Sequence, residues 1–238
     1  MNPAALPLAF GALALALASI ASLRVGLGVS FLVGAGGAYL TAGLLILRRA
    51  DALVSGFGLA NAVTLTRLTI ACLLTGYVTA LLSGFEPTSL QSTAIFTVGV
   101  AALLLDFVDG WVARKTGTAS AFGARFDMEV DALVILVLSI AAWKTGKAGA
   151  WVLMSGAARY LAVAASYVFP TLREPLFPSQ RRRLVAAIQG SVLVALTSPL
   201  IVPPASSLYA AAALALLLYS FGTDIVWQAG ARAARTAA

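Results

Sequence analysis

Residues 106–131 read DFVDGWVARKTGTASAFGARFDMEVD, a stretch that holds five of the nine acidic residues in the chain. Asp106 and Asp109 are three residues apart, and Asp127 and Asp131 are four apart, so each pair shares one face of a helix. A connection of about nine residues joins the two helices, which is short enough to make them antiparallel neighbours. We therefore predict two helices whose four aspartates lie at a similar depth and face one another.

The rest of the chain is strongly apolar. Hydrophobic residues make up 61% of its 238 residues, charged residues make up 11%, and the mean hydropathy is +0.95. So few charges could not cover the surface of a soluble protein, in which roughly 25% of residues are charged. The same numbers exclude intrinsic disorder, the single cysteine excludes a disulfide scaffold, and the lack of histidine excludes any site that needs one. The composition predicts an all-α, polytopic membrane protein.

Eight stretches approach the roughly 20 apolar residues that a helix needs to cross a bilayer. The predicted spans are residues 5–23, 26–47, 62–83, 91–114, 124–143, 148–168, 184–202 and 205–228. Breaks that contain glycine, proline or lysine separate most of them. Residues 51–60, between the second and third spans, are mixed in character and are predicted to form an interfacial segment.

The lysines and arginines predict the orientation of these spans. With the N-terminus inside, twelve of the sixteen basic residues fall on one side, and Arg24, Lys144 and Lys147 fall on the other. Arg159 falls in the middle of a span. Because positive residues are enriched in cytoplasmic loops, the side with twelve is predicted to be cytoplasmic. The aspartates belong to the same side, since Asp106 lies roughly 12 Å along its helix from the basic pair at residues 114–115.

Four carboxylates that converge near a membrane need counter-charges. Arg114 and Arg125 offset only part of this charge, so one or two bound divalent cations are expected. Carboxylate oxygens suit Mg²⁺, Mn²⁺ or Ca²⁺, whereas the absence of histidine argues against zinc. Glu129 points away from Asp127 and Asp131 on a regular helix, and we expect it to be solvated or salt-bridged.

Written as a pattern, the stretch is Asp106-x2-Asp109-Gly110-x2-Ala113-Arg114-x8-Gly123-x3-Asp127-x3-Asp131. This pattern resembles the signature of the CDP-alcohol phosphotransferase (CDP-alcohol phosphatidyltransferase) family at every fixed residue and gap. Upstream, Asn61-Ala-Val-Thr64-Leu-Thr-Arg67 is similar to the family's Pro-Asn-x-Leu-Thr-x-x-Arg segment, with Ala60 in place of the proline and Val63 in place of the leucine.

The resemblance implies a six-transmembrane-helix catalytic core over residues 61–238. Two extra N-terminal transmembrane helices, in residues 1–50, precede this core and have no assigned role. The resemblance also implies a phospholipid-synthesising enzyme in which an alcohol hydroxyl attacks the β-phosphorus of a CDP-alcohol, usually CDP-diacylglycerol, and CMP leaves. The expected partners are this lipid, the acceptor alcohol, membrane lipids and a second copy in a homodimer, without nucleic acid.

The family pattern also implies a role for particular residues. Asp106, Asp109, Asp127 and Asp131 would hold two Mg²⁺ or Mn²⁺ ions, and Asp131 would also be the general base. The residues implied to contact or make room for the CDP group are Gly110, Ala113, Arg114, Ser120, Gly123, Asn61 and Thr64.

Three arginines are candidates for binding the acceptor alcohol. Arg159 lies mid-span, where a bare guanidinium is costly, so we expect it to face the cavity. Arg181 and Arg182 begin a segment, residues 179–189, that resembles the basic segment opening the fifth core helix of several family members. Such residues can hold an acceptor phosphate, as in glycerol phosphate or inositol phosphate, but the positive-inside rule explains them equally well.

Two other classes of protein are compatible with intramembrane acids. An ion-coupled transporter would use them to carry cations, although such sites usually lie at the midplane between repeats, and no repeat is apparent here. An aspartate-rich prenyltransferase would lack the Gly110, Ala113, Arg114 and Gly123 elements. The transferase is the preferred hypothesis, in the inner or plasma membrane with its active site on the cytoplasmic side.

Overall fold

The computed structural model describes residues 5–48, 59–116, 121–168 and 179–236, and within these ranges every regular element is a helix. The α-helices are α1 (Ala5–Arg24), α2 (Gly28–Arg48), α3 (Leu59–Leu82), α4 (Ser89–Thr116), α5 (Ala121–Lys144), α6 (Leu153–Val168), α7 (Gln180–Leu196) and α8 (Ala205–Thr236), with a short 3-10 helix, η2 (Ala150–Val152), before α6. The all-α class predicted from the composition is therefore confirmed.

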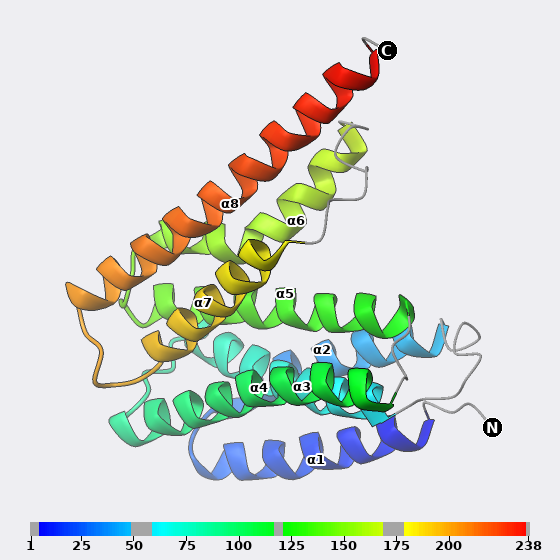
Figure 1. Ribbon diagram of the computed structural model, residues 1–238. Helices are drawn as coiled ribbons and strands as arrows, with labels where there is room; N and C mark the ends of the chain where they lie inside the picture. The colour runs from blue at the N-terminus through cyan, green and yellow to red at the C-terminus, as the bar shows by residue number, and fades with distance from the viewer. Residues whose placement is uncertain (1–4, 49–58, 117–120, 169–178, 237–238) are drawn as a thin grey trace.

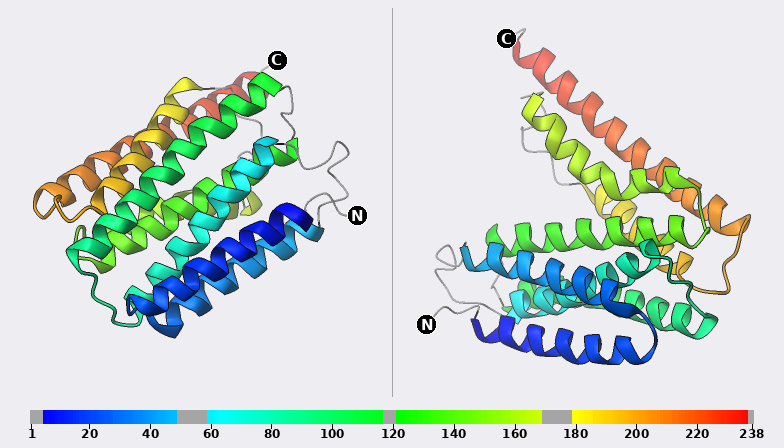
Figure 2. Two further views of the ribbon diagram at one scale, coloured as in Figure 1. Left: turned by 90° about the horizontal axis from the view of Figure 1, so that it is seen from below. Right: turned by 180° about the vertical axis from the view of Figure 1, so that it is seen from behind.

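Helix α3 is the centre of the bundle. It contacts α1, α2, α4 and α5, and 67% of its apolar span is buried, whereas 11–22% is buried in the spans of α1, α2, α4 and α8. The successive helices α1 to α5 run antiparallel to one another, so the beginnings of α1, α3 and α5 lie at the same end of the bundle as the ends of α2 and α4 (Figure 1). Figure 2 shows the same layer from below and from behind.

The hairpin of α1 and α2 packs closely on α3. At Gly76 of α3, an added Cβ would lie 2.8 Å from the backbone oxygen of Phe31, so this contact leaves no room for a side chain. Thr79 donates a hydrogen bond to the backbone oxygen of Ser30 at 2.8 Å. Within the hairpin, the Tyr39 hydroxyl donates to the backbone oxygen of Leu8 at 2.7 Å. The two N-terminal helices thus pack tightly against the central helix, and hydrogen bonds stabilise this packing.

Helices α6 and α8 lean away from this layer (Figure 1). Helix α7 lies between α8 and the pair α4 and α5, whereas α6 packs directly against α5. Lys147, in the connection between α5 and α6, binds the connection between α7 and α8. Its ammonium group donates to the backbone oxygens of Ser198 and Ile201 at 3.0 and 2.6 Å. The hydroxyls of Ser206 and Ser207 donate in turn to the backbone oxygen of Lys147. Two chain connections are therefore tied together at the end of the bundle where α5 ends.

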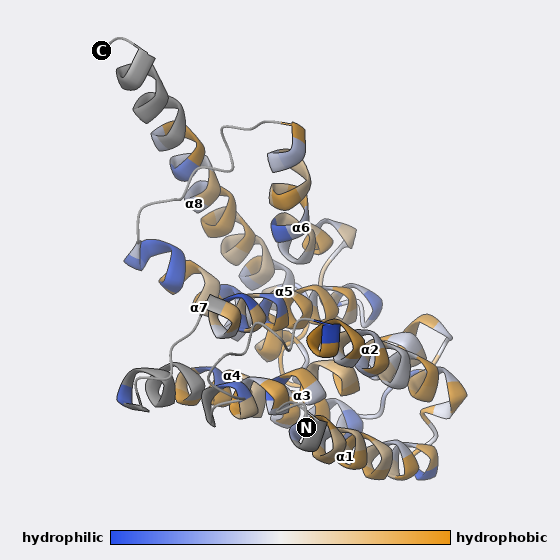
Figure 3. Ribbon diagram, turned by 90° about the vertical axis from the view of Figure 1, so that its right-hand side faces the viewer, coloured by the Kyte–Doolittle hydropathy of each residue, from blue (hydrophilic) through white to orange (hydrophobic). Residues whose placement is uncertain are grey.

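Five of the described helices are long and apolar enough to cross a membrane, namely α1, α2, α3, α4 and α8. Figure 3 shows hydrophobic residues along most of α1 to α3 and hydrophilic residues at the beginning of α7. Many large apolar side chains on these helices are exposed, as expected where lipid rather than protein covers them. The chain is an integral membrane protein, whereas crossings by α5, α6 and α7 stay predictions.

The seventh predicted span differs from the observed helix. Residues 184–202 were expected, but α7 covers Gln180–Leu196. The helix begins earlier because arginines are good helix formers, even though they lower the hydropathy on which the prediction relied. It ends earlier because Pro199 lacks the N–H that would continue the helix. The predicted interfacial segment at residues 51–60 lies mostly outside the described residues.

Candidate active site

Asp106, Asp127 and Asp131 converge at the end of the bundle where α5 begins. Asp106 lies on α4, and the other two lie on α5. Each offers a carboxylate oxygen, and these three oxygens lie within 4.8 Å of one another. All three side chains are half-buried, so the cluster is accessible from outside the protein. The facing arrangement predicted from the i, i+3 and i, i+4 spacings is therefore present for these three residues.

Arg67 of α3 lies among the three carboxylates, and its side chain is only 4% exposed. One guanidinium nitrogen contacts Asp127, and the other contacts both Asp131 and Asp106, the last at 2.9 Å. In the sequence, Arg67 is the last residue of the motif that begins at Asn61, and nothing local marks it as a partner of the aspartates. The available signal was its position three residues after Thr64 and six after Asn61, which keeps all three residues within an arc of about 120° around the helix.

That face of α3 points into the protein. Asn61, Thr64 and Arg67 are all buried, whereas neighbouring Thr66 is exposed and donates a hydrogen bond back to Ala62. Helix α3 packs against both α4 and α5, which carry the aspartates. The buried side of α3 that carries Asn61 and Thr64 also carries Arg67, so Arg67 reaches the aspartates from there. The two segments of the signature, about 40 residues apart in sequence, thus meet at one site.

Asp109, a predicted metal ligand, and several predicted contacts of the nucleotide fall at the edge of the described structure. Asp109, Gly110, Ala113 and Arg114 belong to α4, with Asp109 one turn beyond Asp106, but their side chains are outside the described part of the chain. Ser120 lies outside the described residues altogether. Gly123 lies in the first turn of α5, one turn before Asp127. The roles of all these residues stay predictions.

Arg159 of α6 forms an ion pair with Glu129 of α5, with 2.5 Å between Nη2 and Oε1. This confirms that Glu129 is salt-bridged, and its side chain is 60% exposed. Glu129 lies on the face of α5 opposite Asp127 and Asp131, so the structure directs Arg159 to that opposite face. The structure does not bring Arg159 to the aspartates, and its proposed role toward the acceptor stays untested.

Arg181 and Arg182, at the beginning of α7, both pair with Asp224 of α8. The distances from their guanidinium nitrogens to the Asp224 carboxylate oxygens are 2.5 and 3.5 Å. The Asp224 side chain is only 15% exposed, so this acid is largely enclosed by the α7–α8 contact. Sequence reasoning missed Asp224, because it lies 43 residues from Arg181 and carries no local motif. The two arginines thus have a structural partner in addition to any acceptor.

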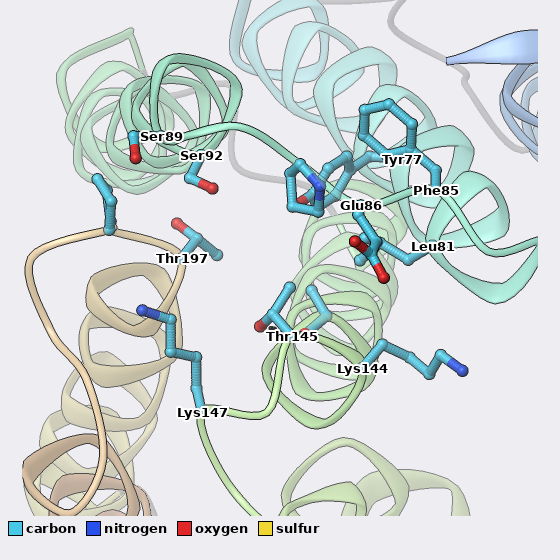
Figure 4. Close-up of a pocket in the computed structure, with 13 residues that line it drawn as sticks. Tyr77, Leu81, Phe85, Glu86, Ser89, Ser92, Lys144, Thr145, Lys147 and Thr197 are labelled. Atoms are coloured by element: carbon cyan, nitrogen blue, oxygen red, sulfur yellow. Dashed lines mark hydrogen bonds between the residues drawn. The ribbon is translucent and has the colours of Figure 1, made fainter. Parts of the chain in front are cut away.

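A separate pocket of about 410 Å³ opens at the other end of the bundle. Figure 4 shows Lys147 and Thr197 on one side of it and Tyr77 and Phe85 on the other. Burial lowers the pKa of Lys147 below its usual value. The pocket reaches α5 at Ala141 and Lys144, roughly 15–20 Å along the helix from Asp131. It is therefore a different place from the aspartate cluster.

The donor set of the cluster fits a hard divalent cation. Its described ligands are all carboxylate oxygens, which Mg²⁺, Mn²⁺ and Ca²⁺ prefer, and their separations allow one ion to contact several of them. Their half-buried position leaves room for a phosphate group to approach from outside.

Comparison with known families supports the same region of the chain. The family model described as CDP-alcohol phosphatidyltransferase matches residues 57–226, which is well over half of the sequence and includes α3 to α7 and most of α8. No curated protein and no solved structure matches the chain. The matched region contains the aspartate cluster and Arg67, and it begins after the two N-terminal helices.

Proposed function

The chain belongs to the CDP-alcohol phosphatidyltransferase family, and from this premise we propose that it transfers a phosphatidyl group from CDP-diacylglycerol to an acceptor alcohol. As a family member it is a membrane transferase for substituted phosphate groups. The observation that carries the finer proposal is the convergence of Asp106, Asp127 and Asp131. The family match favours this enzyme over the ion-coupled transporter, which also would use intramembrane acids.

In the proposed reaction, the acceptor hydroxyl oxygen attacks the β-phosphorus of the CDP-lipid. A new phosphorus–oxygen bond forms to the acceptor, and the bond to the bridging oxygen of CMP breaks. Asp131 accepts the hydroxyl proton, and CMP leaves as an anion. A carboxylate is a modest base, so its contribution depends on holding the hydroxyl within hydrogen-bond reach, about 3 Å.

Asp106, Asp109, Asp127 and Asp131 are the proposed ligands of two divalent cations, Mg²⁺ or Mn²⁺. Such ions, when bound, neutralise the charge that develops on the attacking and leaving oxygens of a phosphoryl transfer. The aspartates would hold the cations at the end of the bundle that we assign to the cytoplasmic side. CMP can then leave into water, while both lipids stay in the bilayer.

The nucleotide would lie beside this cluster. We assign Gly110, Ala113 and Gly123 to making space for it, because small residues let a planar group approach a helix closely. The polar residues Asn61, Thr64, Arg114 and Ser120 are assigned to contacts with the CDP group. The burial of Asn61 and Thr64 on the face of α3 that carries Arg67 supports their place near the cluster.

The acceptor is proposed to carry a phosphate, held by Arg159, Arg181 and Arg182. The latter two arginines share one carboxylate, Asp224, so together they retain a net positive charge. Arginine is suited to this task because its planar group donates two parallel hydrogen bonds to a phosphate. Glycerol phosphate and inositol phosphate are therefore the first acceptors to test.

The test measures CMP release by the purified protein in detergent micelles. CDP-diacylglycerol is supplied with Mg²⁺ or Mn²⁺ and a panel of alcohols that includes glycerol phosphate, inositol phosphate, serine and inositol. We expect release that depends on both the cation and a phosphorylated acceptor, and that a chelator abolishes. Folded protein that releases no CMP with any acceptor would contradict the proposal.

A further inference from the structure

Arg67 is the innermost charged residue of the aspartate cluster, although α3 contributes no acid to it. Its guanidinium contacts Oδ1 of Asp106, Asp127 and Asp131, which are three of the proposed metal ligands. Its side chain is almost fully buried, whereas each carboxylate is half-buried. The guanidinium thus approaches the carboxylates from the protein interior, and the carboxylates retain an outward side.

A divalent cation held by these carboxylates would share them with Arg67. Two positive groups that bind the same oxygens repel each other, and the repulsion is strong because water does not screen a buried guanidinium. In addition, Arg67 already neutralises part of the carboxylate charge. Both effects lower the gain in free energy when the cation binds, so they act in the same direction.

We propose that Arg67 is the internal counter-ion of the aspartate cluster and competes with the divalent cation for it. The inference rests on the proposed metal-dependent function and adds a residue that sets the metal affinity of the site. Three carboxylates and one guanidinium leave a formal charge of −2 among these four residues, compared with −3 for the three carboxylates alone. Arg67 is a positioning residue, since it acts through the aspartates.

A purely structural role for Arg67 makes the opposite prediction. If Arg67 only braced the carboxylates in place, its removal would let them spread apart, and the cation would bind more weakly. If Arg67 competes, its removal leaves uncompensated carboxylates that bind the cation more tightly. The direction of the change in metal affinity therefore separates the two roles.

The experiment titrates full-length protein in detergent with Mn²⁺ and measures free Mn²⁺ by electron paramagnetic resonance. Arg67→Gln should bind Mn²⁺ at least about tenfold more tightly than the wild type. Arg67→Lys keeps the charge but lacks the planar fork that reaches three carboxylates, so it should bind a few-fold more tightly. Arg125→Gln is the control, because it removes an exposed arginine two residues from Asp127 and should change the affinity less than threefold.

Thermal unfolding provides a second readout that does not depend on catalysis. Arg67→Gln should unfold at a lower temperature than the wild type in chelator, and saturating Mn²⁺ should raise its unfolding temperature by more, because tighter binding stabilises the folded state further. If Arg67→Gln is recovered only with Mn²⁺, its affinity is measured by titrating a competing chelator. If Arg67→Gln does not fold at all, the Mn²⁺ affinity of Arg67→Lys, compared with that of the wild type, tests the proposal instead.

If the wild type binds Mn²⁺ and the Arg67 variants bind it equally well or more weakly, Arg67 does not compete with the cation. That result would overturn this inference and leave the proposed function intact. A wild type that binds no Mn²⁺ would overturn both this inference and the metal dependence of the proposed function. The two failures are therefore distinguishable in one set of titrations.

Discussion

Two carboxylates on α5, Asp131 and Glu129, differ sharply in their surroundings although they are two residues apart. Asp131 lies with Asp106 and Asp127 around Arg67, whereas Glu129 reaches the opposite face and pairs with Arg159. The helical period alone separates them, since two positions along a helix correspond to about 200° of rotation. This pair provides a matched comparison at the scale of single residues.

We predict that Asp131→Asn lowers kcat at least about 100-fold, because an amide cannot accept the hydroxyl proton. Binding of CMP should persist, since the nucleotide contacts are assigned to other residues. Single-turnover CMP release and equilibrium CMP binding measure the two effects. Glu129→Gln, the same chemical change on the other face, should keep kcat within about twofold. Full turnover by Asp131→Asn would remove this residue as the base.

Arg159 has two candidate roles, and the same control variant separates them. If Arg159 binds the acceptor phosphate, Arg159→Ala should raise the acceptor KM about tenfold and change the KM for CDP-diacylglycerol little, because a lost charge-assisted hydrogen bond costs about 1.5–3 kcal/mol. Glu129→Gln should leave both KM values unchanged. Steady-state kinetics, with each substrate varied in turn, measures both KM values. If Arg159 only forms its ion pair with Glu129, Arg159→Ala and Glu129→Gln should change these KM values equally.

At the scale of helices, α6 is held against α5 by a close backbone approach at Gly156. An added Cβ there would lie 2.5 Å from both the Cα of Leu136 and the Oγ of Ser139. The Leu136 contact is with backbone, so it can be relieved only by moving a helix. Small residues at such crossings are a common way to pack helices in membranes, where the hydrophobic effect does not drive helix association.

We predict that Gly156→Ala destabilises the protein by about 1–3 kcal/mol, since overpacking forces helices apart. Gly222→Ala is the matched control, because nothing outside the adjacent backbone of α8 lies within 4 Å of the added Cβ. It should leave stability unchanged or raise it slightly, as alanine favours a helix. Thermal unfolding in detergent, followed by tryptophan fluorescence, compares the two. Equal unfolding temperatures of the two variants would contradict the prediction, because they would show that α5 and α6 can move apart without loss of stability.

At the scale of the whole molecule, the ends of the bundle are chemically distinct. One end carries the aspartate cluster and Arg67, and the other carries the connection after α5 with Lys147 and the pocket beside it. We predict that the aspartate end faces the cytoplasm, because the positive-inside rule, applied to the predicted spans, puts most of the arginines and lysines on that side.

Labelling of introduced cysteines with a membrane-impermeant maleimide tests this orientation. We expect Ser83→Cys, exposed after α3, to react in intact cells, and Ala124→Cys, exposed near the start of α5, to react only after the membrane is opened. The native thiol, Cys72, is fully buried and should give no background. The reverse pattern of labelling would place the aspartates on the outer side.

Much of the helical layout follows from local sequence. Long apolar stretches predict the helices, and the capping pair Thr88 and Gln91 marks the beginning of α4, where the two residues exchange hydrogen bonds. The boundary error at α7 arose because hydropathy registers membrane-compatible residues, whereas a helix also includes polar ones such as Arg181 and Arg182. Proline, by contrast, limits any helix for steric reasons.

The sequence by itself determined the helical membrane class, the family and the facing of Asp106 toward Asp127 and Asp131, because composition and helical period are local properties of a chain. Only the tertiary structure decided which charges meet. Arg67 reaches Asp127 and Asp131 across 60 and 64 residues, and Arg159 reaches Glu129 across 30. No local rule predicts such partners, since they depend on how the helices pack: the close fit of α3 between α4 and α5 brings a buried arginine to the carboxylates.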